Sequence, residues 1–123
     1  MIIFNIIAVL YLVSGLWCSF QADRSMAFLG YDSTSQFSVG EFITVYGGLQ
    51  IGIGLAMLLV NWLPQYFGGT LLFATVFSLV LILVRIATLF AYGFFEQGTM
   101  MAGLELIIAV CLVVLFARHH FVA

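Results

Sequence analysis

The sequence between residues 69 and 117 reads GTLLFATVFSLVLILVRIATLFAYGFFEQGTMMAGLELIIAVCLVVLFA. It contains two apolar runs, at about residues 69–94 and 99–117, joined by a short turn at Glu96-Gln97-Gly98. A helix needs about 20 apolar residues to cross a bilayer core, so each run is long enough to span a membrane. The strands of a transmembrane barrel would instead alternate over about 10 residues. The stretch therefore predicts two transmembrane helices that form an antiparallel hairpin.

Two further apolar runs, at about residues 2–20 and 41–62, precede this hairpin. The chain has 123 residues, of which 65% are hydrophobic and 7% are charged, and its mean hydropathy is +1.27. This composition excludes a soluble domain, and three arginines without a lysine exclude a nucleic-acid surface. We expect one integral membrane domain over residues 1–123, with an all-α fold that forms a transmembrane four-helix bundle.

The segment between the first two helices, residues 21–40, is expected to contain a short interfacial helix. Asp23 has the chemistry of an N-cap for residues 24–29, and Gly30 is a typical helix stop. We expect the apolar side chains of this helix to face lipid. They are Met26, Phe28 and Leu29. Residues 31–36 are expected to form a polar loop.

The second helix is expected to begin at a capping box. Ser38 and Glu41 have the required spacing, in which the serine caps the helix and the glutamate reaches back to it. Pro64 follows the end of the second apolar run, and a proline cannot continue a helix.

Arg85 and Glu105 are charged residues deep inside the last two apolar runs. In an antiparallel hairpin, residues at equal depth have numbers that add up to a constant. The midpoint between 85 and 105 falls at the turn, so the two charges lie at about the same depth. A charge at the centre of a span costs roughly 2.5–3.5 kcal/mol unless it is paired or hydrated. We therefore expect Arg85 and Glu105 to interact directly or through one water molecule.

Each predicted helix also carries a stripe of small or polar residues, and these stripes are expected to face the inside of the bundle. Counting residues from the helix ends places one polar cluster in a single half of the bundle. Its members are Arg85, Glu105, Gln50, Tyr46 and Ser14. Three interpretations remain open for it: a structural ion pair, a pocket for a small amphipathic molecule, and proton or ion conduction.

Four glycines of the second helix are expected to serve helix packing, because small residues let membrane helices approach closely. They are Gly47, Gly48, Gly52 and Gly54. Gly48 and Gly52 form a small-xxx-small pair, and this face is the best candidate for a close helix contact, either inside the bundle or between subunits. The sequence predicts no catalytic residue and no metal site.

Arg118 closes the last helix and favours a cytoplasmic C-terminus, although Arg24 in the opposite loop argues against it. Four spans then place the N-terminus on the same side. No haem is expected, because no histidine lies within a span. The depths of Cys18 and Cys111 are expected to differ by more than about 10 Å, which excludes a disulfide, because the two Cα atoms of a disulfide lie within about 7 Å of each other.

Four segments together suggest a known family. They are Tyr11-Leu12-Val13-Ser14-Gly15-Leu16, Val45-Tyr46-Gly47-Gly48-Leu49-Gln50-Ile51-Gly52-Ile53-Gly54-Leu55, Leu83-Val84-Arg85-Ile86 and Gly103-Leu104-Glu105-Leu106. This set resembles the DoxX-like superfamily of small four-helix bacterial membrane proteins, in a branch known only as a domain of unknown function. That branch often has an arginine shortly before Tyr-Gly-Gly, where this chain has Ile43 and Thr44. The resemblance implies a bacterial inner-membrane bundle. The named members of the superfamily are small subunits associated with quinone-linked sulfur oxidation.

These observations favour a small accessory or scaffold subunit of a larger membrane complex rather than an enzyme. An intramembrane polar pocket in it could hold a lipid or a quinone. The first alternative is a component of a redox-linked or lipid-modifying membrane enzyme that uses the same pocket. The second is an oligomeric small transporter. The expected partners are membrane lipids and other membrane subunits or further copies of the chain, and no nucleic acid.

Overall fold

The computed structural model describes residues 1–30, 36–94 and 96–122, so the predicted polar loop lies almost entirely outside the described residues. Within these ranges the chain contains no β-strand. Four helices are long and apolar enough to cross a membrane: Ile2–Phe20, Phe37–Leu59, Pro64–Tyr92 and Glu96–Phe121. The predicted all-α transmembrane class is therefore confirmed.

The contacts of the chain divide it into two compact units, Met1–Leu59 and Val60–Ala123. Each unit contributes two of the four long helices and is described by itself below. The expectation of one integral domain over the whole chain stays a prediction.

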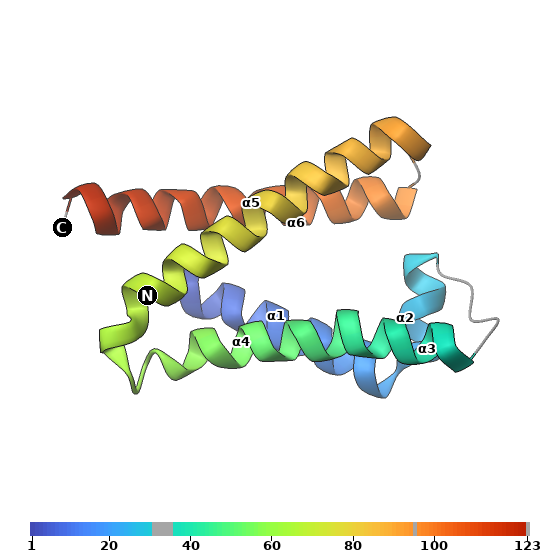
Figure 1. Cartoon of the computed structure of the whole chain (residues 1–123), viewed down its shortest axis with the longest axis horizontal. Coiled ribbons are helices and arrows are strands. Elements are labelled where there is room, and N and C mark those ends of the chain that lie inside the picture. Colours follow the sequence, from blue (N-terminus) through green and yellow to red (C-terminus); the bar gives the residue numbers. More distant parts are fainter. Residues whose placement is uncertain (31–35, 95, 123) are drawn as a thin grey trace. The chain divides into compact units, whose positions relative to one another are not determined.

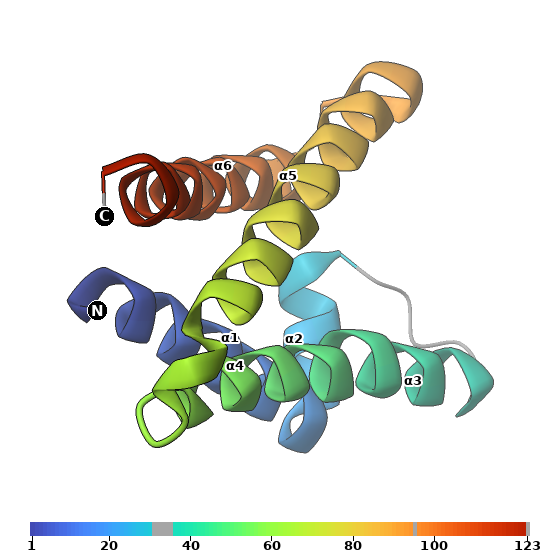
Figure 2. The same ribbon diagram turned by 60° about the vertical axis from the view of Figure 1, so that its left-hand side comes forward.

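In the first unit, α1 (Ile2–Phe20) lies beside α4 (Leu49–Leu59), as both views show (Figures 1 and 2). The helix that contains α4 starts earlier, as α3 (Gln36–Phe42), and passes through a π-helical segment, η1 (Ile43–Gly48). The Leu49 N–H donates to the Thr44 carbonyl, five residues back. A π-turn inside a membrane helix is rare and frequently marks a functional position.

The predicted capping box is wrong. Helix α3 is already formed at Gln36, two residues before Ser38. An N-cap residue must precede the first helical residue, and Ser38 lies within the helix.

The predicted interfacial helix is present as α2 (Ala22–Leu29), and it ends at Gly30, whose φ of 84° is left-handed. Two details differ from expectation. Gln21, with φ −127° and ψ 51°, occupies the N-cap position, so Asp23 lies in the first turn. Met26 does not face lipid: it is only 2% exposed, because α2 packs this side chain against Cys18 and Phe42.

In the second unit, Pro64 opens a 3-10 turn, η2 (Pro64–Tyr66), that leads into α5 (Phe67–Tyr92). Gly93, with φ 117°, ends α5. Helix α6 (Glu96–Ala117) then packs against α5 and ends in the π-helical segment η3 (Arg118–Val122). The hairpin was predicted correctly, but Glu96 is the first residue of α6 rather than part of the turn.

Candidate functional site

The clearest polar feature of the second unit is the ion pair between Arg85 on α5 and Glu105 on α6. The Arg85 Nη2–Glu105 Oε1 distance is 2.8 Å, and the Nε–Oε2 distance is 3.1 Å. The two side chains are 23% and 9% exposed. Two parallel N–H···O bonds give this pair the bidentate geometry that makes arginine–carboxylate interactions strong and directional. The direct interaction expected from the sequence is thus present.

This geometry engages both oxygens of the Glu105 carboxylate. The pair links two helices at equal depth, where removing either partner would leave the other charge buried and unpaired. Its chemistry is therefore that of a cross-link within the α5–α6 hairpin.

Thr75 provides a second polar link in the same hairpin, and the sequence interpretation missed it. Its hydroxyl donates to the Leu71 carbonyl at 2.7 Å, and the Leu112 carbonyl of α6 lies 3.4 Å away. The Thr75 side chain is buried, at 5% exposure. The sequence did contain a signal for this link, because Thr75 is a hydroxyl residue inside a span and lies next to the small Ala74. A hydroxyl in such a position bonds either its own helix or a neighbouring one.

In the first unit, α1 and the second long helix are held together by close approach of their backbones rather than by an ion pair. A Cβ added at Gly15 of α1 would lie 2.7 Å from the Gly47 oxygen and from the Ile51 nitrogen. A Cβ added at Gly54 would lie 2.8 Å from the Ala8 oxygen and from the Leu12 nitrogen. Real Cβ atoms do not approach backbone so closely, so only glycine permits this contact between α1 and the second long helix.

Gly48 and Gly52 behave differently from their neighbours. A Cβ added at either position would meet no described atom of the first unit within 4 Å. Within the first unit, the close contact is therefore made by Gly47 and Gly54, and not by the Gly48/Gly52 face. Both expected uses of this face outside the first unit, contact with another helix of the bundle and contact between subunits, stay predictions.

Three more residues of the predicted cluster lie in the first unit. Tyr46, in η1, stacks on Phe42 with ring centroids 4.9 Å apart. The Gln50 Oε1 atom is buried and has no hydrogen-bond partner among the described residues. Ser14 is partly buried on α1. Arg85 and Glu105 belong to the other unit, so the convergence of all five side chains stays a prediction.

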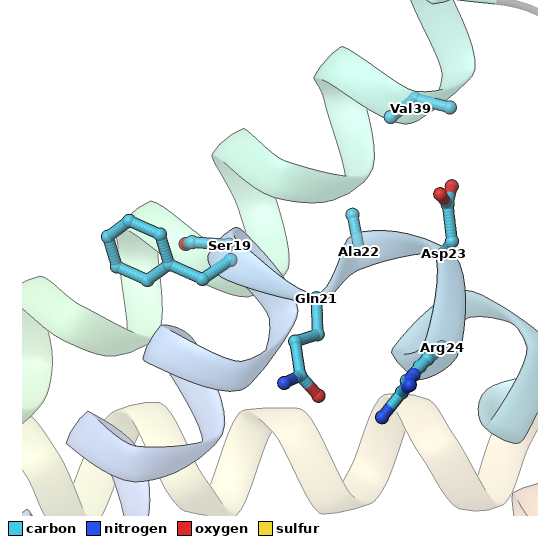
Figure 3. Close-up of a pocket in the computed structure, with 7 residues that line it drawn as sticks. Ser19, Gln21, Ala22, Asp23, Arg24 and Val39 are labelled. Atoms are coloured by element: carbon cyan, nitrogen blue, oxygen red, sulfur yellow. The ribbon is translucent and has the colours of Figure 1, made fainter.

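A hollow of about 540 Å³ lies at the corner between α1 and α2. Figure 3 shows its polar side chains pointing apart: Asp23 is directed to the side of Val39, whereas Gln21 and Arg24 point to the opposite side. A binding site needs polar groups that converge on one ligand. The arrangement of this corner therefore does not suit a single polar ligand.

Among the described residues, no group of three or more histidine, cysteine, aspartate or glutamate side chains could hold a metal ion. Comparison of the chain with protein-family models, with curated proteins and with solved structures finds no match.

Proposed function

We propose that this chain is a small accessory or scaffold subunit of a larger membrane complex in a bacterial inner membrane, with both termini in the cytoplasm. One observation carries the proposal, namely the open face of Gly48 and Gly52. Glycine costs a helix interior roughly 1 kcal/mol relative to alanine. Gly47 and Gly54 offset that cost through contact with α1, but Gly48 and Gly52 have no such contact among the described residues of the first unit.

A helix of a partner subunit would explain these two glycines. Small residues four positions apart form a shallow groove, and a second membrane helix can approach its backbone there. The same face extends towards Thr44, Gly40 and Ala56, which are also small and exposed. The resemblance of the Tyr46-Gly47-Gly48 segment to small subunits of the DoxX-like superfamily supports the same role.

The test is site-specific photo-crosslinking in native membranes, with a photoreactive amino acid at position 52. The matched control carries it at position 10, because Leu10 is exposed on α1 and lies in a run without glycine. We expect position 52 to give a discrete cross-linked protein that position 10 does not give, and Gly52→Leu to abolish partner retention in mild detergent. Lipid adducts alone at position 52 would contradict the proposal.

The second candidate function is a component of a redox-linked or lipid-modifying enzyme that holds a quinone or a lipid. The orphaned Gln50 Oε1 atom favours it, because a buried acceptor without a partner costs about 1–3 kcal/mol, which a bound donor would relieve. If so, Gln50→Leu should reduce the amount of one specific lipid or quinol that co-purifies, as measured by mass spectrometry. If the wild-type and Gln50→Leu proteins retain equal amounts, the second candidate function is contradicted and only the scaffold proposal remains.

A further inference from the structure

A second cavity of the first unit, of about 380 Å³, lies between α2 and the α3–η1 segment. Its volume falls in the range of roughly 300–1,000 Å³ that is typical of small-molecule sites. Met26 of α2 forms one wall. The other residues belong to the second long helix and include Phe37, Glu41, Phe42, Val45 and Tyr46. No residue of the predicted polar cluster except Tyr46 lines it.

The walls of this cavity are held in place by packing. Met26 and Phe42 are 2% and 4% exposed and form one apolar cluster with Cys18. Tyr46 packs against this cluster, and its ring stacks on Phe42 at an interplanar angle of 24°. The π-turn of η1 includes Tyr46 and so sets the position of its ring. The cavity is therefore built from aromatic and apolar side chains in defined positions.

Glu41 is the charged group of the cavity, and it has no hydrogen bond or ion pair among the described residues. Its side chain is exposed, and it lies near the start of the candidate span Phe37–Leu59. An acidic side chain within a span normally pairs with another group. No arginine lines the cavity, and Arg24 lies on the side of the α1–α2 corner opposite to Asp23 (Figure 3). The Glu41 carboxylate is therefore available to a cation from a bound molecule.

We propose that this cavity binds the ammonium headgroup of an amphiphile, with the Glu41 carboxylate facing the charge. Aromatic rings attract ammonium groups through their π-faces, and a carboxylate beside them adds direct charge complementarity. Met26, Phe42 and Val45 provide the apolar surface for the hydrocarbon part of the same molecule. The proposal uses the first unit alone and does not depend on the accessory role proposed above.

The probe for this site is a dodecylamine that carries a photoreactive diazirine in its tail. It is added to the purified protein in neutral maltoside micelles, and the labelled peptides are identified by mass spectrometry. We expect label in residues 22–30 and 36–48. Unlabelled competitors then distinguish two sources of the ammonium headgroup. Competition by dodecylamine indicates a free long-chain amine, and competition by short-chain phosphatidylethanolamine indicates a membrane lipid.

Phosphatidylglycerol and dodecyl sulfate lack an ammonium group and should not compete. If either competes as well as the amines, the cavity is only an apolar groove and the proposal is overturned. Label confined to other segments would overturn it as well. These comparisons use the unmodified protein, so they do not depend on the folding of any variant.

Glu41→Gln keeps the size of the side chain and removes its charge, and it should reduce labelling about threefold, the scale of a cation interaction at an exposed site. Glu96→Gln is the matched control, since Glu96 is an exposed glutamate in the first turn of α6 and lies in the other unit. Labelling of the Glu96→Gln protein should equal that of the wild type. Full labelling of the Glu41→Gln protein would mean that Glu41 is solvated at the membrane surface, and would overturn the proposal.

Discussion

The α1–α4 pair and the α5–α6 hairpin join apolar helices in two different ways. In the first unit, Gly15 and Gly54 let backbones approach so closely that no Cβ would fit. In the second unit, the helices are linked by the bidentate Arg85–Glu105 pair, and the Thr75 hydroxyl lies near the Leu112 carbonyl.

The difference shows what holds membrane helices together when lipid tails are as apolar as the side chains. Burial of apolar surface gives little preference for a neighbouring helix over lipid, so close packing or polar bonds must supply it. The glycine contact depends on shape and tolerates no added atom. The ion pair depends on both partners being present. Substitutions in the two units should therefore differ in size and in how they can be rescued.

The largest effect is expected from Arg85→Ala. It leaves the Glu105 carboxylate buried and without its cation, and breaking a buried pair in this way costs about 3–5 kcal/mol. The free energy of unfolding in mixed detergent micelles measures the effect. The double variant Arg85→Leu/Glu105→Leu should recover most of the loss, because an apolar replacement of a whole buried pair is often neutral. An unchanged stability of Arg85→Ala would mean that the pair does not hold the hairpin.

The next largest effect on stability is expected from an alanine at Gly54, and Gly52, two residues earlier, is its control. Gly54→Ala should cost about 1–3 kcal/mol, since the new methyl group meets the Ala8 and Leu12 backbone, which cannot move aside easily. Gly52→Ala adds the same methyl group in open space and should leave stability unchanged or raise it by up to about 1 kcal/mol. Thermal unfolding of the purified proteins tests both. Equal losses would contradict the assignment of the α1 contact to Gly54.

Sequence reasoning succeeded where one strong physical rule acted alone. Continuous apolar runs predicted the four long helices, because a bilayer requires about 20 such residues. The depth argument predicted the Arg85–Glu105 interaction, because an antiparallel hairpin fixes which residues lie at equal depth. Gly30 was predicted as the end of α2, because few other residues adopt its left-handed conformation.

It failed where several local rules competed. Asp23 and Ser38 are both good capping residues, but Asp23 lies in the first turn of α2 and Ser38 lies within α3, so cap chemistry alone does not place these two residues. Met26 is apolar in a short surface helix, and only the fold shows that it packs against Cys18 and Phe42. The π-turn at residues 43–48 has no clear sequence signal beyond the adjacent glycines. Which glycine face meets α1 also depends on this turn, since it rotates the residues that follow.

The smallest effect is expected from Thr75→Val, which keeps the shape of the side chain and removes its hydroxyl. Side-chain hydrogen bonds between membrane helices contribute about 0.6 kcal/mol on average, and at 3.4 Å the contact with the Leu112 carbonyl is at the weak end. Thr88→Val is the matched control, because the Thr88 hydroxyl is exposed and bonds the Arg85 carbonyl of its own helix. We expect Thr75→Val to lower the free energy of unfolding by about 0.5 kcal/mol and Thr88→Val to leave it unchanged. A loss that is equal in both variants would assign the cost to bonds within α5 and not to the contact with the Leu112 carbonyl.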